Sequence, residues 1–156
     1  QKVLNQVVDL IIESGYVEDL QLKEAHFLMN KVKVTIKADK LNSIKDFTSG
    51  YRKEDNIPFQ IFSKGQANYI SMKLPWEGAT SSPDITVLKS LTSKTVFSNK
   101  ISTIFSENKL ELEGRSSDII SFLLQMAEDM LIEQFALSIY RLDTGNFYLL
   151  VQPMKV

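Results

Sequence analysis

The chain of 156 residues has no cysteine, one histidine, one tryptophan and four prolines. Without cysteine, disulfides, thiolate catalysis and cysteine-bound metals are excluded, and one histidine cannot form a His-pair metal site. No apolar run approaches the ~20 residues of a membrane-spanning helix. The net charge is −1, so no strong overall field selects nucleic acid or an anionic membrane.

The composition that remains, 44% hydrophobic and 24% charged, is that of a globular chain and too apolar for a disordered one. The chain begins at Gln1 rather than methionine, which indicates a processed or trimmed product. We therefore expect that an anchor helix can precede this segment.

Hydrophobic periodicity predicts the element order α-β-β-α-β-β for the first half. The "KVKVTIKA" stretch, residues 31–38, alternates apolar and polar residues, so we expect a strand with one wet face. Asp39 is predicted to cap the helix that follows. The other predicted elements are a helix at 3–14, a helix ending before 56–58, and strands at 17–27, 57–63 and 68–74.

The same order returns in the second half. Its predicted elements are a short helix at 84–94, strands at 99–106 and 109–114, a helix at 116–131, and a final hairpin of strands 133–142 and 146–154. The apolar side of the long helix is predicted to be Ile120, Leu123, Leu124, Ala127 and Leu131. The polar stretch 77–84 is the predicted linker between a first unit, 1–76, and a second, 85–156.

Sequence similarity between the halves favours an internal duplication. "NYISMKLPW", 68–76, and "NFYLLVQPM", 146–154, match at an offset of 146 − 68 = 78 residues. At an offset of 76, Val34 matches Leu110 and Ile36 matches Leu112. The alternative is that two unrelated α+β units share this patterning. Either way, the prediction is an α+β fold of two small tandem units.

No catalytic constellation is found, so the prediction is a protein that is not an enzyme and has no cofactor. The nucleotide-binding and nucleophile-elbow glycine motifs are absent from the sequence. Glu24 and His26 share a strand face, which suits either a cation or a half-exposed sheet histidine. Glu111 and Glu113 alternate with leucines, which indicates a solvated face rather than paired catalytic acids.

Two groups of residues are candidates for protein interaction. Strand 147–151 is apolar on both faces, so its second face should be covered by the other half or by a partner chain; its residues are Phe147, Tyr148, Leu149, Leu150 and Val151. The wet strand faces carry opposite charges, Lys31, Lys33 and Lys37 against Glu111 and Glu113. Complementary association is expected from these charges, at ~0–1 kcal/mol for each exposed pair.

The permuted order, ending in the hairpin "ALSIYRLDTGNFYLLVQPM", resembles the periplasmic domains of type IV pilus and type II secretion assembly proteins, the PilN, PilO, GspL and GspM group. The resemblance implies circularly permuted ferredoxin-like units, each an antiparallel sheet with two helices. It also implies a non-catalytic periplasmic scaffold, tethered to the inner membrane by a preceding helix. Its partners would be itself or related single-span membrane proteins, in homo- or heterodimers.

Two other functions remain open from the sequence. A small-molecule-sensing regulatory domain of ferredoxin-like fold would have a pocket between its halves. A nucleic-acid-binding module would use the basic strand 31–38, but RNA readers stack bases on aromatic residues of the wet face, and this strand presents lysine and threonine there.

Overall fold

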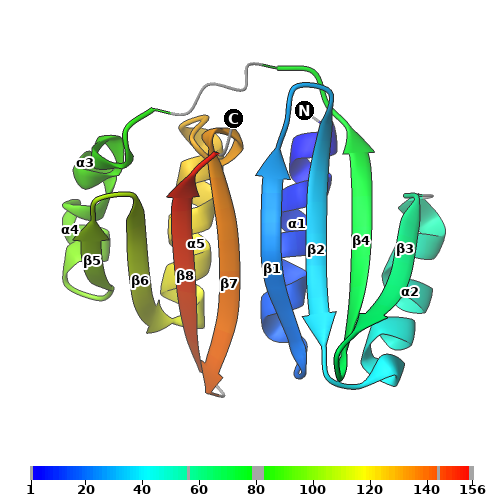
Figure 1. The fold of residues 1–156 in the computed structure, drawn as a ribbon. Coiled ribbons are helices and arrows are strands. Elements are labelled where there is room, and N and C mark those ends of the chain that lie inside the picture. The colour runs from blue at the N-terminus through cyan, green and yellow to red at the C-terminus, as the bar shows by residue number, and fades with distance from the viewer. Residues whose placement is uncertain (1, 56, 79–82, 144, 155–156) are drawn as a thin grey trace.

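The computed structural model describes residues 2–55, 57–78, 83–143 and 145–154. The described residues form an α+β fold, as predicted, in which one eight-stranded antiparallel sheet carries helices on one face (Figure 1). The first half contributes α1 (Lys2–Tyr16), β1 (Leu20–Phe27), β2 (Lys31–Ala38), α2 (Leu41–Asp55), β3 (Phe59–Lys64) and β4 (Ala67–Pro75). The second half contributes η1 (Ile85–Leu88), α3 (Lys89–Thr92), α4 (Thr95–Ser98), β5 (Ser102–Ser106), β6 (Lys109–Arg115), α5 (Ser116–Glu128), η2 (Ile132–Gln134), β7 (Phe135–Asp143) and β8 (Asn146–Pro153).

The strand order is β3-β4-β2-β1-β7-β8-β6-β5. The four strands of each half are therefore neighbours, and the halves join where β1 pairs antiparallel with β7. We call this junction the seam. The sequence predicted a separate antiparallel sheet for each half, whereas edge-to-edge pairing at the seam makes one continuous sheet.

Strand β2 shows why these residues form a sheet with one covered face. Its apolar residues, Val32, Val34, Ile36 and Ala38, are buried, and the alternate positions are half-buried. Successive side chains of a strand point to opposite faces, so the pattern in the sequence becomes a core face and a wet face. The buried apolar side chains of the other strands lie on the same core face, against α1, α2 and α5.

Helix α1 packs across the seam, in contact with β1 and β2 of its own half and with β7 of the other. Gly15 lies where the helix meets Phe147 of β8. A Cβ atom at Gly15 would lie 3.1 Å from the Phe147 ring, which is a tight contact with a side chain that is only 2% exposed. The helix therefore connects the cores of the two halves.

The helical segments of the second half differ from the prediction in two ways. The predicted helix 84–94 is divided into η1 and α3, and α4 follows it in a segment for which no element was predicted. The Thr92 and Ser93 hydroxyls donate to the carbonyls of Lys89 and Ser90, and such side-chain bonds compete with regular helix. Helix α5 ends at Glu128 rather than 131, and Met130 follows with a left-handed φ of 60°.

The predicted apolar side of α5 was partly wrong. The buried residues are Ile119, Phe122, Leu123 and Met126, whereas Leu124 is 48% exposed. Leu123 is common to the predicted and the buried sets, and the predicted Ile120, Ala127 and Leu131 are partly buried against the core. The helix is rotated because the stripe 119–122–126 holds the one phenylalanine of this segment, which has the largest apolar area to bury.

The match that suggested the duplication does not hold as a structural equivalence. Tyr69 pairs with Lys37 and lies on the wet face, whereas Phe147 pairs with Gly114 and is buried. Strands β4 and β8 instead correspond at an offset of 79, since Ile70 faces Ile36 and Leu149 faces Leu112. A shift of one residue along a strand moves every side chain to the other face of the sheet. The 78-residue match therefore pairs residues that lie on opposite faces of the sheet.

Candidate functional site

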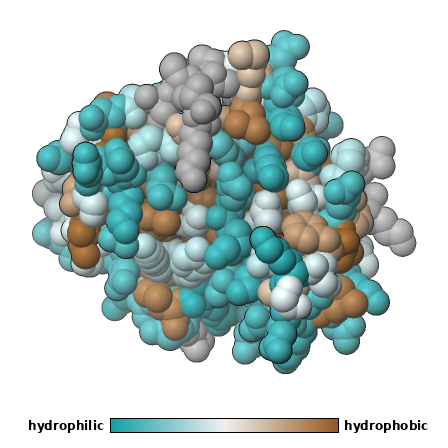
Figure 2. Space-filling view, in the orientation of Figure 1, coloured by the Kyte–Doolittle hydropathy of each residue, from teal (hydrophilic) through white to brown (hydrophobic). Residues whose placement is uncertain are grey.

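The sheet face away from the helices, here called the open face, carries most of the predicted interaction residues. Figure 2, in the orientation of Figure 1, shows a mostly hydrophilic surface with separate hydrophobic patches, some at the left and right margins. Lys31, Lys33 and Lys37 of β2 lie on this face and are half-buried, as the alternation predicted. They give the first half of the open face a basic stripe.

Aromatic residues beside this stripe were missed by the sequence reasoning. Tyr69 of β4 is the cross-strand partner of Lys37, and Phe62 of β3 pairs in turn with Tyr69. The two rings stack, with centroids 5.1 Å apart and planes 10° apart. The prediction from sequence looked for aromatic residues only on the lysine-rich strand itself, whereas these aromatic residues lie on β4 and β3.

Strand β8 divides the predicted apolar cluster between the two faces. Phe147, Leu149 and Val151 are buried on the core face, and Tyr148 and Leu150 lie half-buried on the open face. The interpretation that the other half covers this second face is wrong, because the halves meet edge to edge at the seam. Covering by a partner chain stays a prediction.

Glu111 and Glu113 of β6 lie on the open face beside Tyr148. The Tyr148 hydroxyl donates to Glu111 Oε1 at 2.6 Å, and Lys109 Nζ lies 3.8 Å from the same oxygen. Burial and the bond to Glu111 raise the pKa of Tyr148 above its ordinary value, so this hydroxyl stays protonated as a donor. Glu111 therefore has a fixed local partner, which the sequence did not indicate.

The basic and acidic stripes do not contact each other within the chain. Strands β2 and β6 are separated by β1, β7 and β8, which makes four inter-strand steps. At ~4.8 Å for each step the stripes lie about 19 Å apart, beyond the ~8 Å over which salt screens exposed charges. The expected complementary association can therefore act only between chains.

The centre of the open face lies over the seam. The Ser138 hydroxyl of β7 donates to the Lys23 carbonyl of β1 at 2.7 Å, a cross-seam bond in addition to the backbone ladder. The Lys23 ammonium lies 5.3 Å from the Tyr140 ring centroid, within cation–π range. The ring centroid of Tyr140 lies 5.7 Å from that of Tyr148. Lys23, Tyr140 and Tyr148 thus form a row of contacts on the open face between the basic stripe and the acidic stripe.

Glu24 and His26 contact each other on β1. His26 Nδ1 lies 2.9 Å from Glu24 Oε1, and His26 is 8% exposed, so the half-exposed histidine predicted from sequence is in fact buried. Both residues line a cavity of about 440 Å³ at the seam, with residues of β7 and β8. Within the described ranges, no group of three or more metal-ligating side chains gathers there or elsewhere.

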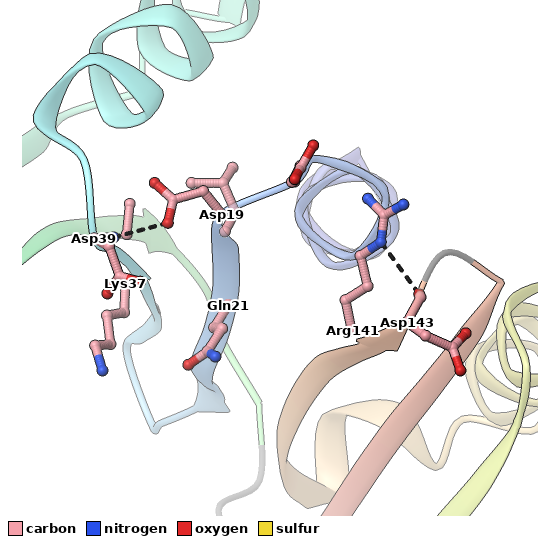
Figure 3. Close-up of a pocket in the computed structure, with 9 residues that line it drawn as sticks. Asp19, Gln21, Lys37, Asp39, Arg141 and Asp143 are labelled. Atoms are coloured by element: carbon pink, nitrogen blue, oxygen red, sulfur yellow. Dashed lines mark hydrogen bonds between the residues drawn. The ribbon is translucent and has the colours of Figure 1, made fainter.

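A second cavity, of about 500 Å³, lies at the other end of the seam (Figure 3). Its rim has Asp19, Gln21 and Lys37 on one side and Arg141 and Asp143 on the other. It forms because the β1–β7 pairing extends only from Leu22↔Ile139 to Ala25↔Leu137, so the strands separate beyond it.

Hydrogen bonds hold both sides of this cavity in place. Arg141 donates through Nη1 to the Tyr16 carbonyl at 3.3 Å and through Nε to the Asp143 carbonyl at 3.3 Å. Bonds from the Gly145 amide and the Asn146 side chain lower the pKa of Asp143. Arg141 and Asp143 are therefore partnered by the protein, and Figure 3 shows the bond between Arg141 and Asp143.

Asp19, rather than the predicted Asp39, accepts hydrogen bonds at the start of α2. Its carboxylate accepts from the Asp39 amide at 3.1 Å, the Lys40 amide at 2.9 Å and the Ser43 hydroxyl at 2.8 Å. Asp19 also has a left-handed φ of 73°, which aspartate tolerates better than most residues. Sequence reasoning missed Asp19 because this contact spans some twenty residues.

We expect Asp19→Asn to lower the free energy of unfolding by ~1 kcal/mol at pH 7, because the amide removes the negative charge and one of the two oxygens that accept these bonds, and bonds to a charged group are stronger than neutral ones by about this amount. Burial acts to raise the pKa of Asp19, but the bonds from Lys40, Ser43 and Asp39 outweigh it and lower the pKa. The contribution is therefore present above the unfolded pKa of ~3.9 and is lost as pH falls through the lower folded value. Urea unfolding at pH 7 and pH 3 measures the difference.

Asp39→Ala is the matched control, since Asp39 is exposed and its amide, not its side chain, contacts Asp19. Asp39→Ala is expected to change stability by less than ~0.5 kcal/mol, the usual range for surface positions. A larger loss for Asp39→Ala than for Asp19→Asn would restore the cap that the sequence predicted.

Comparison of the chain with models of known protein families, with curated proteins and with solved structures found no match. None of the helices in the described segments combines the length and the apolar character needed to cross a bilayer. Function is therefore inferred from the geometry above.

Proposed function

We propose that this chain is a non-catalytic interaction domain that binds a protein partner on its open face. The observation that carries the proposal is the arrangement of one uncovered sheet face with a basic stripe, a tyrosine centre and an acidic stripe. The solvated face of an antiparallel sheet is usually polar, whereas Leu150 and Tyr148 remain half-exposed in the middle of this face, and tyrosine is enriched at protein interfaces.

The assembly in which such a domain serves is also a proposal. Both halves have the same strand order with helices on one face, which supports an interpretation as two circularly permuted ferredoxin-like units. That interpretation favours the resemblance to pilus and secretion assembly proteins. We therefore propose that the domain is a periplasmic scaffold of an inner-membrane platform, held there by a segment outside these residues.

Site-specific photocrosslinking in cells tests where the partner binds. A benzophenone amino acid at Lys33 or Leu150 samples the basic stripe and the centre of the open face. The same amino acid at Leu124, which is 48% exposed on α5, samples the helix side. We expect a defined crosslinked protein from the two open-face positions and no such product from Leu124. Crosslinking only from Leu124 would place the interaction on the helices and contradict the proposal.

Protease accessibility tests the proposed compartment separately. In the full-length native protein, residues 1–156 are expected to be cut in cells whose outer envelope has been opened and protected in intact cells. Protection in both, with a protein that does not sediment with the membrane, would remove the envelope assignment. That result would leave the open-face proposal unchanged, because only the crosslinking experiment tests it.

Ligand sensing is the second candidate, because a cavity of about 500 Å³ does lie between the halves. That volume falls in the ~300–1,000 Å³ range of small-molecule sites. Its lining is mostly charged, with the cationic groups Arg141 and Lys37 against the carboxylates of Glu18, Asp19, Asp39 and Asp143. Because carboxylates outnumber cations in this lining, a cationic metabolite fits it better than an anionic one. Thermal stabilisation by a cationic metabolite that is lost in Asp39→Ala, with the open-face crosslinks absent, would favour this candidate.

A further inference from the structure

The two lateral edges of the sheet both expose apolar side chains. Strand β3 forms one edge, where Phe59, Ile61 and Phe62 are 42%, 40% and 43% exposed. Strand β5 forms the other, where Ile104 is 59% exposed. Natural edge strands are usually protected by charge, proline or a covering segment, because their free backbone groups pair with other strands. Apolar residues on both edges therefore indicate a partner strand.

The seam shows which strand fits each edge. Across the sheet from the β3 edge to the β5 edge, the first half is ordered β3-β4-β2-β1 and the second half β7-β8-β6-β5. Strand β7 thus occupies in the second half the place of β3 in the first, and β5 occupies the place of β1. The seam joins β1 to β7. The two free edges, β5 and β3, are consequently the same two kinds of edge that the seam already joins.

Direction and facing agree with this correspondence. Every neighbouring pair in the sheet is antiparallel, so across eight strands β5 runs opposite to β3. A second copy placed beside β5 through its β3 would continue the alternation. It would also keep all helices on one face of the sheet, as the seam does within the chain (Figure 1).

We propose that β5 of one copy pairs antiparallel with β3 of a second copy, so that the sheet continues head to tail from chain to chain. This contact uses the sheet edges and does not depend on what the open face binds. A head-to-tail contact of this kind is heterologous, and it generates open arrays rather than closed dimers.

The seam also predicts the register for the β5 edge. Leu22 pairs with Ile36 and Thr103 pairs with Leu112, and these partners are 112 − 36 = 76 residues apart. Ala25 pairs with Val34 and Phe105 pairs with Leu110, again 110 − 34 = 76 apart. Thr103 and Phe105 therefore stand in β5 where Leu22 and Ala25 stand in β1.

The β3 edge follows in the same way. Ile61 pairs with Ile70, and Ile139 pairs with Leu149, which is the counterpart of Ile70. Likewise Phe59 pairs with Met72, and Leu137 with Val151. Since Leu22 and Ala25 pair with Ile139 and Leu137 at the seam, Thr103 is expected opposite Ile61 of the second copy, and Phe105 opposite its Phe59.

This register buries apolar surface on both faces. On the core face, the half-buried Phe105, with Lys89 Nζ 5.5 Å from its ring centroid, would meet Phe59. On the open face, Ile104 would lie opposite Gln60 and diagonal to Phe62, within reach across neighbouring strands. Strand β5 has five residues and β3 has six, so the contact is small and its affinity is expected to be modest.

Because the chain has no cysteine, disulfide trapping tests the register without background. The variant with both Ile61→Cys and Thr103→Cys, oxidised at increasing protein concentration, is expected to form a ladder of dimers, trimers and higher species on a non-reducing gel. Each single variant is expected to remain mainly monomeric, and the two single variants mixed are expected to form dimers. A Gln60→Cys and Ile104→Cys pair tests the adjacent position of the same register, because pairs with the wider and the closer Cα spacing alternate along antiparallel strands.

Two controls make the result specific. Leu142→Cys, which is 50% exposed in β7 and lies on neither free edge, measures random collision. Phe59→Lys in the double-cysteine variant is expected to reduce the ladder by tenfold or more, while far-UV circular dichroism and the melting temperature stay close to those of the parent. Dimers from one single variant alone, as abundant as the mixed dimers, would show symmetric pairing and overturn the proposal. Crosslinking no greater than that of Leu142→Cys with both cysteine pairs would also overturn it.

Discussion

Replacing Phe122 by alanine is expected to lower the free energy of unfolding by about 3–5 kcal/mol, the usual cost of a large cavity in a packed core. Phe122 is fully buried in α5, and its ring lies 5.2 Å from that of Phe97 in an edge-to-face contact. Chemical unfolding followed by far-UV circular dichroism measures the loss. A cost of this size is a large fraction of the stability of an ordinary domain.

The same variant tests whether the seam couples the halves. The only tryptophan, Trp76, lies in the first half, packed 4.9 Å from Phe27, so its fluorescence reports on that half alone. If the sheet unfolds as one unit, the Trp76 transition shifts together with the circular dichroism transition. An unchanged Trp76 transition, with circular dichroism divided into two steps, would show that the halves are separate units, as the predicted boundaries at 77–84 suggest.

Leu124→Ala is the matched control on the same helix. Leu124 is 48% exposed, and alanine has the higher helix propensity, so the change is expected to stay within about 0.5 kcal/mol. A loss comparable to that of Phe122→Ala would mean that the buried side of α5 is the one the sequence predicted.

Leu137→Asp is expected to have the largest effect of any variant described here and to prevent cooperative folding. Leu137 is fully buried and pairs with Ala25 across the seam, so the variant loses the ~2–5 kcal/mol of a core leucine. It also buries a carboxylate within the apolar core cluster, which costs several kcal/mol more. The measurement is the loss of sharp amide dispersion in proton NMR and of a cooperative thermal transition.

Leu142→Asp makes the same chemical change in the same strand, at a side chain that is 50% exposed. It is expected to fold and melt near the parent temperature. Cooperative unfolding of Leu137→Asp, with Trp76 still reporting a native first half, would show that the seam contributes little to the stability of that half.

The α+β class and all eight strands could be predicted from the sequence because their signals are local. The alternation of 31–38 marks β2 without reference to any other strand, and "KLELEG" marks β6 in the same way. Where two neighbouring residues are equally apolar, the sequence does not show which of them is buried. Leu124 and Leu123 are equally apolar, and only packing decides which of them α5 buries.

The candidate site was less accessible because it is made by contacts between distant residues. The sequence placed Lys37 and Glu111 on wet faces, but it contains no local sign that Tyr69 stands beside the first or that Tyr148 donates to the second. The seam itself was missed for the same reason. A pairing of β1 with β7 depends on two edges fitting each other after both halves have formed.

The pairing at the seam has a consequence for the order in which the protein is made. Strand β1 is complete at Phe27, and its partner region in β7 extends to Ile139, so 139 − 27 = 112 residues separate the two. At a synthesis rate of about 5–20 residues per second, β1 remains an uncovered edge for roughly 5–20 seconds on the ribosome. The bulge between Leu22 and Ala25, with Lys23 exposed at its centre, interrupts that edge and discourages pairing with neighbouring nascent chains until β7 arrives.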